Sequence, residues 1–174
     1  MSEDPEFSLD KAFEDQIDFD AIADVEESGL LPEGTYVTVP ALKVTWETQP
    51  HEAYPRGRRI VRFFGQVTGR QGEEDVRGWV GFDISPDTAL EPDTRRDGKP
   101  NRNAGKPDGL SRRWAQCVRA YQVAVGENPT TSGHVIAFVR DYPVQLRVGR
   151  YAPPDREARN VGYSISPVRP SATV

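Results

Sequence analysis

Two stretches of alternating residues decide the fold of this chain: RRIVRFFGQVT at residues 58–68 and EDVRGWVGFDIS at residues 74–85. Successive side chains of a β-strand point to opposite faces of its sheet, so each stretch has one aliphatic face and one mixed face. Between them, GRQG at residues 69–72 has the composition of a turn. We therefore predict two antiparallel strands joined as a hairpin.

The two faces of this hairpin differ in chemistry. The aliphatic face carries Val61, Phe63, Gly65, Val67, Val76, Gly78, Val80, Phe82 and Ile84. If that face is core, Arg62, Phe64, Arg77 and Trp79 project together from the other one. Single-stranded nucleic acid requires such a mixture, because guanidinium groups bind phosphates and each base stacked on a ring contributes about 1 to 3 kcal/mol. The alternative is that Phe64 and Trp79 are buried under the acidic N-terminus or a long loop.

Charge is divided unevenly along the chain. Residues 1–33 hold twelve acidic residues and one lysine, whereas residues 34–174 hold fifteen acidic and twenty-one basic residues. The net charge of −5 therefore hides a basic domain with an acidic arm. Such asymmetry favours a polyanionic partner for the basic part, with the acidic part as a competitor or a docking segment. The simpler alternative is that both parts are solvated surface that keeps the protein soluble.

Length and composition favour one β-rich domain. We expect an acidic, flexible arm at residues 1–30, a domain at residues 31–167 and a short tail at residues 168–174. A hydrophobic share of 36% with 15 Gly and 15 Pro suits a loop-rich β protein better than a helical bundle. The single cysteine excludes an internal disulfide.

Further strands are expected on both sides of the hairpin. Residues 35–46 are rich in Val, Thr, Tyr and Trp and predict a strand, with Pro40 at an edge or a bulge. Residues 47–57 are expected to form a polar loop. Residues 144–151 and 160–166 alternate as two more strands.

Helices are predicted between the third and fourth strands. At residues 110–126, apolar side chains recur every three or four positions and Gly126 ends the pattern. The apolar stripe consists of Leu110, Trp114, Cys117, Val118, Tyr121 and Val125, which we expect to face the core. A shorter helix is expected at about residues 134–140. A mainly β chain with five strands in this order predicts an OB-like, five-stranded Greek-key barrel with one or two helices.

The connection at residues 86–109 is longer than ordinary loops and rich in Pro, Gly, Asn and Asp. Loops of this length are usually functional or disordered. Its basic residues are Arg95, Arg96, Lys99, Arg102 and Lys106. A basic loop could close over a phosphate backbone, and a solvated insertion explains the composition about as well.

Short motifs run through most of this domain: LPEGTY at 31–36, GRR at 57–59 leading into FF at 63–64, PVQLRV at 143–148 and NVGY at 160–163. Together with the acidic leader and the helix at 110–126, they resemble small phage-encoded proteins of the single-stranded-DNA-binding, replication and recombination type. The resemblance implies an OB-like barrel that binds single-stranded DNA as a non-enzymatic accessory factor.

From the mixed strand face, the basic loop and the later strands, we select candidate nucleic-acid-binding residues. They are Arg58, Arg59, Arg62, Phe64, Arg77, Trp79, Arg95, Arg96, Lys99, Arg102, Lys106, Arg147 and Tyr151. In this hypothesis the acidic arm occupies the basic surface when DNA is absent, or docks onto a replication or recombination protein. A homo-oligomer is compatible with the sequence.

No catalytic or cofactor-binding pattern stands out. One cysteine and two histidines, His51 and His134, do not form a recognised metal spacing. There is no phosphate-binding glycine motif and no nucleophile elbow around a serine. We therefore expect a protein without enzymatic activity, metal or cofactor. The sequence also has no apolar stretch long enough to cross a bilayer and no signal-peptide pattern, so we expect a cytoplasmic protein, in the host cell if phage-encoded.

Two other functions remain open. A β-rich virion structural or assembly protein could use the N-terminal arm to hold a neighbouring subunit. An arm rich in carboxylates could also mimic DNA and inhibit a host protein.

Overall fold

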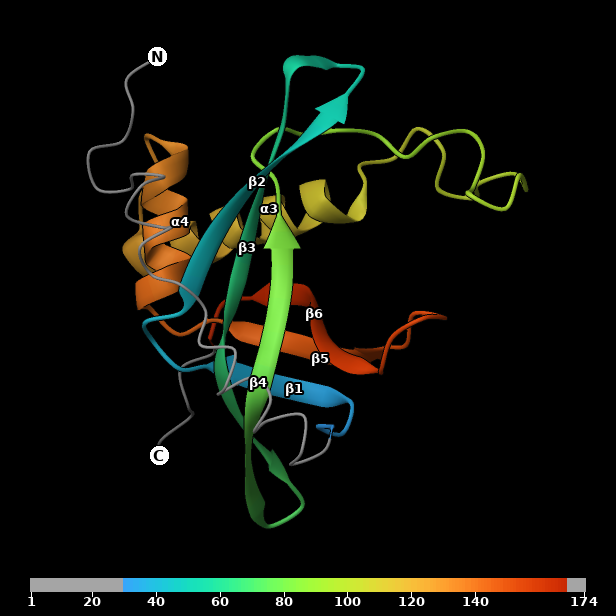
Figure 1. Ribbon diagram of the computed structural model, residues 1–174. Coiled ribbons are helices and arrows are strands. Elements are labelled where there is room, and N and C mark those ends of the chain that lie inside the picture. The colour runs from blue at the N-terminus through green and yellow to red at the C-terminus, as the bar shows by residue number, and fades with distance from the viewer. Residues whose placement is uncertain (1–29, 169–174) are drawn as a thin grey trace.

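Strands dominate the part of the chain that the structure describes. The computed structural model describes residues 30–168 (Figure 1). In chain order the elements are β1 (Gly34–Thr38), β2 (Lys43–His51), β3 (Tyr54–Gln71), β4 (Glu74–Ile84), α3 (Gly109–Val125), α4 (Ser132–Asp141), β5 (Gln145–Tyr151) and β6 (Arg159–Ser166). The predictions for the acidic arm and for the C-terminal tail lie outside the described residues, except at Leu30 and Val168.

The six strands form one mixed sheet whose pairings close on themselves. Their order is β1-β5-β6-β4-β3-β2, and β1 also pairs with β3. A ring of hydrogen bonds therefore runs through β1, β5, β6, β4 and β3, while β2 continues the sheet along β3. The β4–β6 pairing is parallel and the other pairings are antiparallel.

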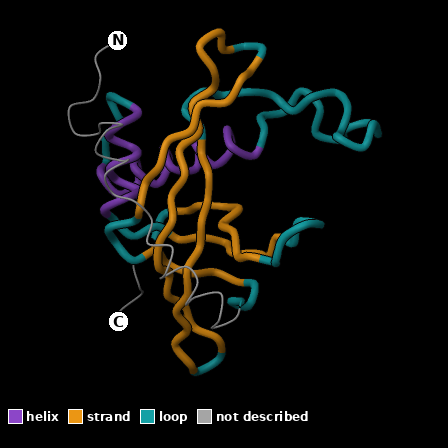
Figure 2. Tube along the Cα trace, viewed as in Figure 1, coloured by secondary structure: helices purple, strands orange, loops and turns teal. Residues whose placement is uncertain are grey.

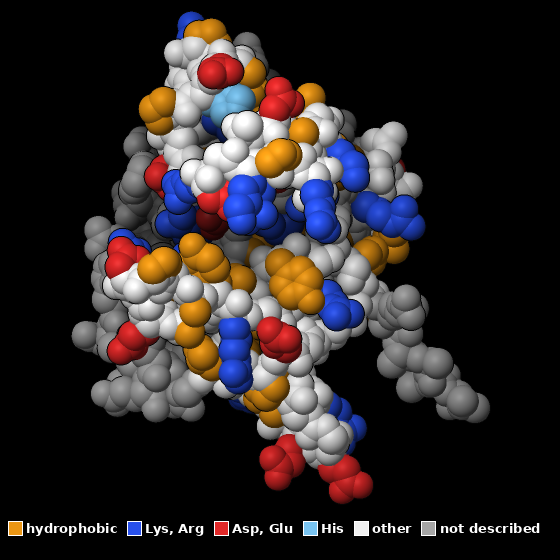
Figure 3. All heavy atoms as spheres, turned by 90° about the vertical axis from the view of Figure 1, so that its right-hand side faces the viewer, with side chains coloured by type: hydrophobic (Ala, Val, Ile, Leu, Met, Phe, Trp, Pro, Cys, Tyr) orange, Lys and Arg blue, Asp and Glu red, His pale blue; other side chains and the backbone are white. Residues whose placement is uncertain are grey.

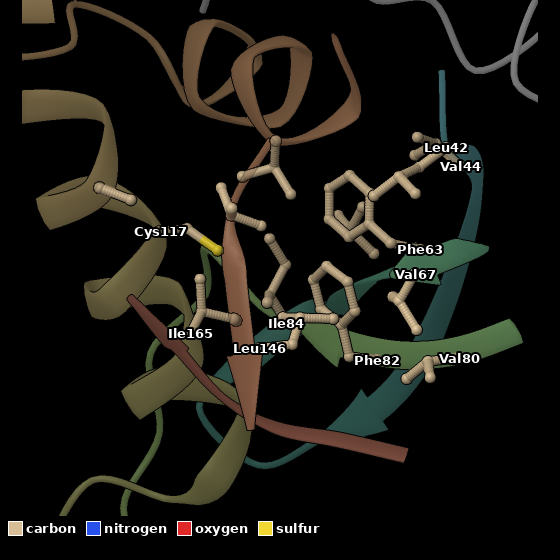
Figure 4. Close-up of a cluster of buried hydrophobic side chains, with 14 of the residues drawn as sticks. Leu42, Val44, Phe63, Val67, Val80, Phe82, Ile84, Cys117, Leu146 and Ile165 are labelled. Carbon is tan, nitrogen blue, oxygen red and sulfur yellow. The ribbon is translucent and has the colours of Figure 1, made fainter. Parts of the chain in front are cut away.

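The hairpin of β3 and β4 sets the core, as its alternation predicts. Phe63 lies opposite Phe82 in the register, and their rings stack with centroids 5.0 Å apart. Both phenylalanines are buried, together with Val61, Val67, Val80 and Ile84. Figure 4 shows this cluster between the strands, with Leu146 and Ile165 of β5 and β6 on one side. Burial of such side chains contributes about 1.5 to 3 kcal/mol each, so the hairpin face is a principal source of stability.

The strand predicted at residues 35–46 is interrupted. Pro40 has no N–H to give to a neighbouring strand, and Ala41 has a positive φ of 73°. The backbone N–H groups of Ala41 and Leu42 donate to the carbonyl oxygen of Arg140 instead, which turns the chain away from β5. One expected strand is therefore two, β1 and β2, with a sharp bend between them.

The prediction of a polar loop at residues 47–57 is wrong. Strands β2 and β3 stay paired as far as His51 and Tyr54, with a turn at Glu52 and Ala53. Much of this extension is exposed, so its side chains carry no core pattern, while the ladder hydrogen bonds require only backbone groups. At the other end, β3 also runs further than expected and the turn falls at Gly72 and Glu73.

The helices lie together against the sheet (Figure 1). Helix α3 occupies the expected region, with the Asp108 carboxylate accepting from the N–H of Ser111 at its start and left-handed Gly126 at its end. Cys117 is buried on its inner side, and Trp114 and Tyr121 pack against the core. Val125, by contrast, is exposed. Within residues 30–168 no helix combines the length and apolar character needed to cross a membrane.

Candidate nucleic-acid interface

The outer faces of β3 and β4 bring Phe64 and Trp79 together. Phe64 lies opposite Gly81 and Trp79 opposite Gln66, so the two aromatic side chains are diagonal neighbours across the hairpin. Their rings stack at an angle of 18° with centroids 5.5 Å apart. Both residues are partly exposed. Within the described residues, the long loop does not bury them.

This aromatic pair lines a cavity of about 670 Å³, which we call the groove. Arg62, Phe64 and Trp79 of β3 and β4 form one wall. The opposite wall is formed by Tyr151 at the end of β5, by Arg159 and Tyr163 of β6 and by Glu157 and Ala158 of the segment that joins these strands. Figure 3 shows a hollow on this side of the molecule, with Lys and Arg side chains above it and hydrophobic side chains below it. The groove therefore combines aromatic surface with three arginines, Arg62, Arg113 and Arg159, and two carboxylates, Asp83 and Glu157.

The far wall adds two tyrosines. Tyr151 and Tyr163 are each about half exposed. The guanidinium carbon of Arg159 lies 5.5 Å from the centre of the Tyr151 ring, a cation–π contact. The Arg147 Nε donates to the Tyr163 hydroxyl at 3.3 Å. Rings and guanidinium groups therefore alternate on this wall as they do on the β3–β4 wall.

Arg62, the most central predicted cation, already has carboxylate partners. Its Nε and Nη2 donate to Asp83 at 2.9 and 3.2 Å, and Glu47 lies 3.7 Å away. The hydrogen bonds that Arg62 donates to the Asp83 carboxylate hold the pKa of Arg62 above its usual value. A phosphate would have to compete with these carboxylates, so Arg62 contributes less positive potential than its position alone indicates.

Arg113 of α3 is a groove residue that the sequence prediction missed. Its Nε donates to the backbone oxygen of Asp83 at 2.6 Å, and no carboxylate among residues 30–168 forms an ion pair with it. Burial lowers the pKa of this guanidinium. An incoming anion would offset that unfavourable burial. In the sequence, the feature that indicates this placement is the position of Arg113 one turn before Cys117, in line with the buried side of the helix.

Arg58 and Arg59 were predicted to bind nucleic acid, but both hold the base of the long loop. Arg58 is only 5% exposed and donates to both carboxylate oxygens of Asp108, at 2.6 and 2.9 Å. Arg59 forms a similar pair with Asp87, at 3.1 and 2.8 Å. The alternation of β3 did not reveal this role, because both acidic partners come from the loop. We exclude Arg58 from the candidate interface for this reason.

The other predicted cations lie outside the lining of the groove. Arg77 is exposed further along β4, opposite Thr68, and Arg147 is exposed on β5. The five basic residues of the long loop lie on a separate projection, described below. Of the predicted residues, the groove itself brings together Arg62, Phe64, Trp79 and Tyr151.

No candidate metal site is found in the described part of the chain. Between residues 30 and 168 no three His, Cys, Asp or Glu side chains lie together as a metal site. The chain was compared with protein-family models, with curated proteins and with solved structures, and none of the three comparisons found a match.

Proposed function

We propose that residues 31–167 form an OB-like barrel that binds single-stranded DNA in the groove, as an accessory factor of phage replication or recombination. If β1 and β2 are counted as one bent strand, the chain has five strands with α3 and α4 between the third and fourth. The first strand then pairs with both the second and the fourth, and the parallel β4–β6 contact closes the ring. This order supports a Greek-key barrel of the oligonucleotide-binding type.

The position of the groove supports the same proposal. In oligonucleotide-binding barrels, the ligand lies on the second and third strands between the loops that follow the first and fourth strands. Here these strands are β3 and β4, and the later loop is the β5–β6 connection that forms the far wall of the groove. The position therefore agrees with a binding site for an extended chain of nucleotides.

One observation carries the proposal: the stacked, partly exposed pair of Phe64 and Trp79 faces a cavity that Arg113 and Arg159 also line. Aromatic faces accept any base, and guanidinium groups accept phosphates, so binding would depend weakly on sequence and strongly on salt. This chemistry requires no catalytic group and no cofactor.

The test is fluorescence anisotropy with labelled single-stranded and duplex DNA at about 50 and 200 mM salt, a range over which phosphate contacts lose much of their affinity. We expect preference for the single strand, and a loss of about 1 to 3 kcal/mol for Trp79→Ala. Tyr142→Ala is the matched control, since Tyr142 is exposed and stacked on Phe138 outside the groove. No binding at the lower salt, or equal losses in both variants, would contradict the proposal.

A virion structural or assembly role remains the second candidate, because β2 pairs on one side only. Within the described residues, β2 ends the sheet order and presents an unpaired edge to which another chain could add a strand. Sedimentation without nucleic acid separates the two functions. A structural component forms large assemblies alone, whereas the proposed binder stays small and shifts on addition of an oligonucleotide.

A further inference from the structure

The loop between β4 and α3 is a folded projection, which we call the finger (residues 88–107). Its two sides meet at the bridges between Leu90 and Pro107 and between Thr94 and Pro100. The N–H of Glu91 donates to the oxygen of Lys106 at 2.8 Å, which ties the two sides together. In Figures 1 and 2 the finger extends away from the body, on the same side as the β5–β6 connection. None of its residues lines the groove.

The base of the finger is fixed to the barrel by buried polar contacts. Besides its pair with Asp108, Arg58 donates from Nε to the backbone oxygen of Asp87 at 2.8 Å. The Ser111 hydroxyl accepts from the N–H of Ala89 at 2.8 Å. Ser85 donates to the backbone oxygen of Arg59 at 2.6 Å. The direction of the finger is therefore set by the same residues that begin α3.

Positive charge is concentrated in the outer part of the finger. Residues 94–106 contain five basic residues and one acidic residue, Asp97. Asp97 lies 3.4 Å from Arg95. Within the described residues, no ion pair is formed by the other four, which are Arg96, Lys99, Arg102 and Lys106. Arg95, Arg96 and Arg102 line a shallow cavity with a volume of about 420 Å³.

The finger contains no aromatic residue, in contrast to the groove. Single-stranded sites combine cations with rings on which the bases stack, because unpaired bases expose their faces. Duplex DNA hides those faces and presents a dense row of phosphates, which Arg, Lys and polar side chains bind without stacking. The chemistry of the finger therefore fits the backbone of a duplex better than it fits a single strand.

We propose that the finger binds the phosphate backbone of duplex DNA next to a single strand held in the groove. The protein then recognises a junction between single-stranded and duplex DNA more tightly than either part alone, because one molecule engages both. This inference rests on the proposed function for the groove and assigns a different ligand to the finger.

The experiment compares three labelled DNAs by anisotropy over a series of salt concentrations. They are a single strand of about 16 nucleotides, at the upper end of the site size of one OB fold, the same strand joined to a duplex of about one helical turn, 10 base pairs, and the blunt duplex. Tails of both polarities are included. We expect the junction to bind most tightly, with a slope of log affinity against log salt that is steeper by about 0.9 for each phosphate that the finger contacts.

The decisive variant is Arg96→Gln with Arg102→Gln, which removes two exposed charges from the finger and leaves the groove intact. For the junction, the slope of log affinity against log salt concentration should become shallower by about 2. The affinity for the single strand should stay within twofold of that of the unmodified protein. The matched control is Arg70→Gln with Arg119→Gln, which removes the same charge from the β3–β4 end and from an exposed position of α3.

The outcomes separate this inference from the proposed function. Equal binding of the single strand and the junction would overturn the role of the finger and leave the groove proposal standing. A junction preference that survives in the finger variant, or disappears equally in the control, would also overturn it. Failure to bind the single strand at any salt concentration would overturn both proposals.

Discussion

Arg58 brings a full positive charge into the interior and meets three acceptors there: the Asp87 backbone, the Asp108 carboxylate and the Ser111 hydroxyl. A buried ion pair adds little net stability compared with well-packed apolar residues, but the loss of one partner leaves an uncompensated charge. We infer that this pair fixes the geometry between the finger, β3 and α3 more than it stabilises the domain.

Removal of the Asp108 carboxylate should therefore be costly. We expect Asp108→Ala to reduce the free energy of unfolding by about 3 to 5 kcal/mol, since Arg58 stays buried without its partner. Urea unfolding measures the loss. The control is Asp141→Ala, which removes the more exposed Arg140–Asp141 pair and should change the same free energy by about 0 to 1 kcal/mol. Equal losses in the two variants would show that Arg58 finds other compensation.

Acid should weaken the domain through Asp87 and Asp108. Burial opposes their ionisation, but hydrogen bonds from Arg59 to Asp87 and from Arg58 to Asp108 hold the pKa of each carboxyl below its usual value. A group with a lowered folded-state pKa stabilises the fold above the unfolded pKa of about 3.9 and loses that contribution as the pH falls through the folded value. The urea concentration at the unfolding midpoint should therefore decrease as the pH drops below about 4. The decrease should be less steep in Asp108→Asn. An unchanged acid profile in that variant would contradict this role.

Among the elements, β3 and β4 could be predicted because one face of each is core and the other is not. Alternation of apolar and polar residues reflects burial of one strand face. It therefore predicts β3 and β4, whose inner faces carry the buried Phe63 and Phe82, but it does not predict the exposed continuation of β2 as far as His51. The sequence predicts an edge position or a bulge at Pro40. The interruption of the strand there also involves the carbonyl group of Arg140, which is distant in sequence and accepts from Ala41 and Leu42.

Helix α3 links the core to both candidate DNA-binding elements. Its N-cap Asp108 and its first-turn Ser111 hold the base of the finger, and Arg113 in the next turn lines the groove. The strand pattern alone places Phe64 and Trp79 together on the outer face of β3 and β4. For Arg113 the sequence offers only its position one turn before Cys117, and a single basic residue on an amphipathic helix is usually solvated. The packing of α3 against β4 and β6 places it at the groove.

At the scale of the whole molecule, the described part of the chain starts at the groove. Leu31 is buried, and its N–H and C=O groups form hydrogen bonds of 2.7 and 3.0 Å with the Asn160 side chain. Its side chain occupies the space above Gly78, where an added Cβ atom would lie 2.6 Å from it. Leu30 lines the groove itself. A segment tethered there would reach the groove cations at high effective concentration.

Deletion of residues 1–29 should therefore tighten DNA binding. It removes eleven acidic residues and one lysine. In the proposal that the arm competes with DNA for the groove, this deletion removes the competitor. We expect the gain in affinity to be larger at about 50 mM than at 200 mM salt, because salt screens competition between charges. Anisotropy of the full and shortened chains measures it, and a synthetic peptide of residues 1–29 added to the shortened chain should reverse the gain. Unchanged or weaker binding after deletion would leave docking to a partner protein as the role of the arm.

The single cysteine provides a chemical probe of local opening in the domain. Cys117 is fully buried in the core and burial raises the pKa of its thiol, so alkylating reagents can modify it only when α3 separates from the sheet. The rate of modification then reports how often this contact opens, and a DNA that holds α3 through Arg113 should slow it. A cysteine introduced at the exposed Asn103 of the finger would react far faster, so the finger could carry a dye while Cys117 stays unlabelled.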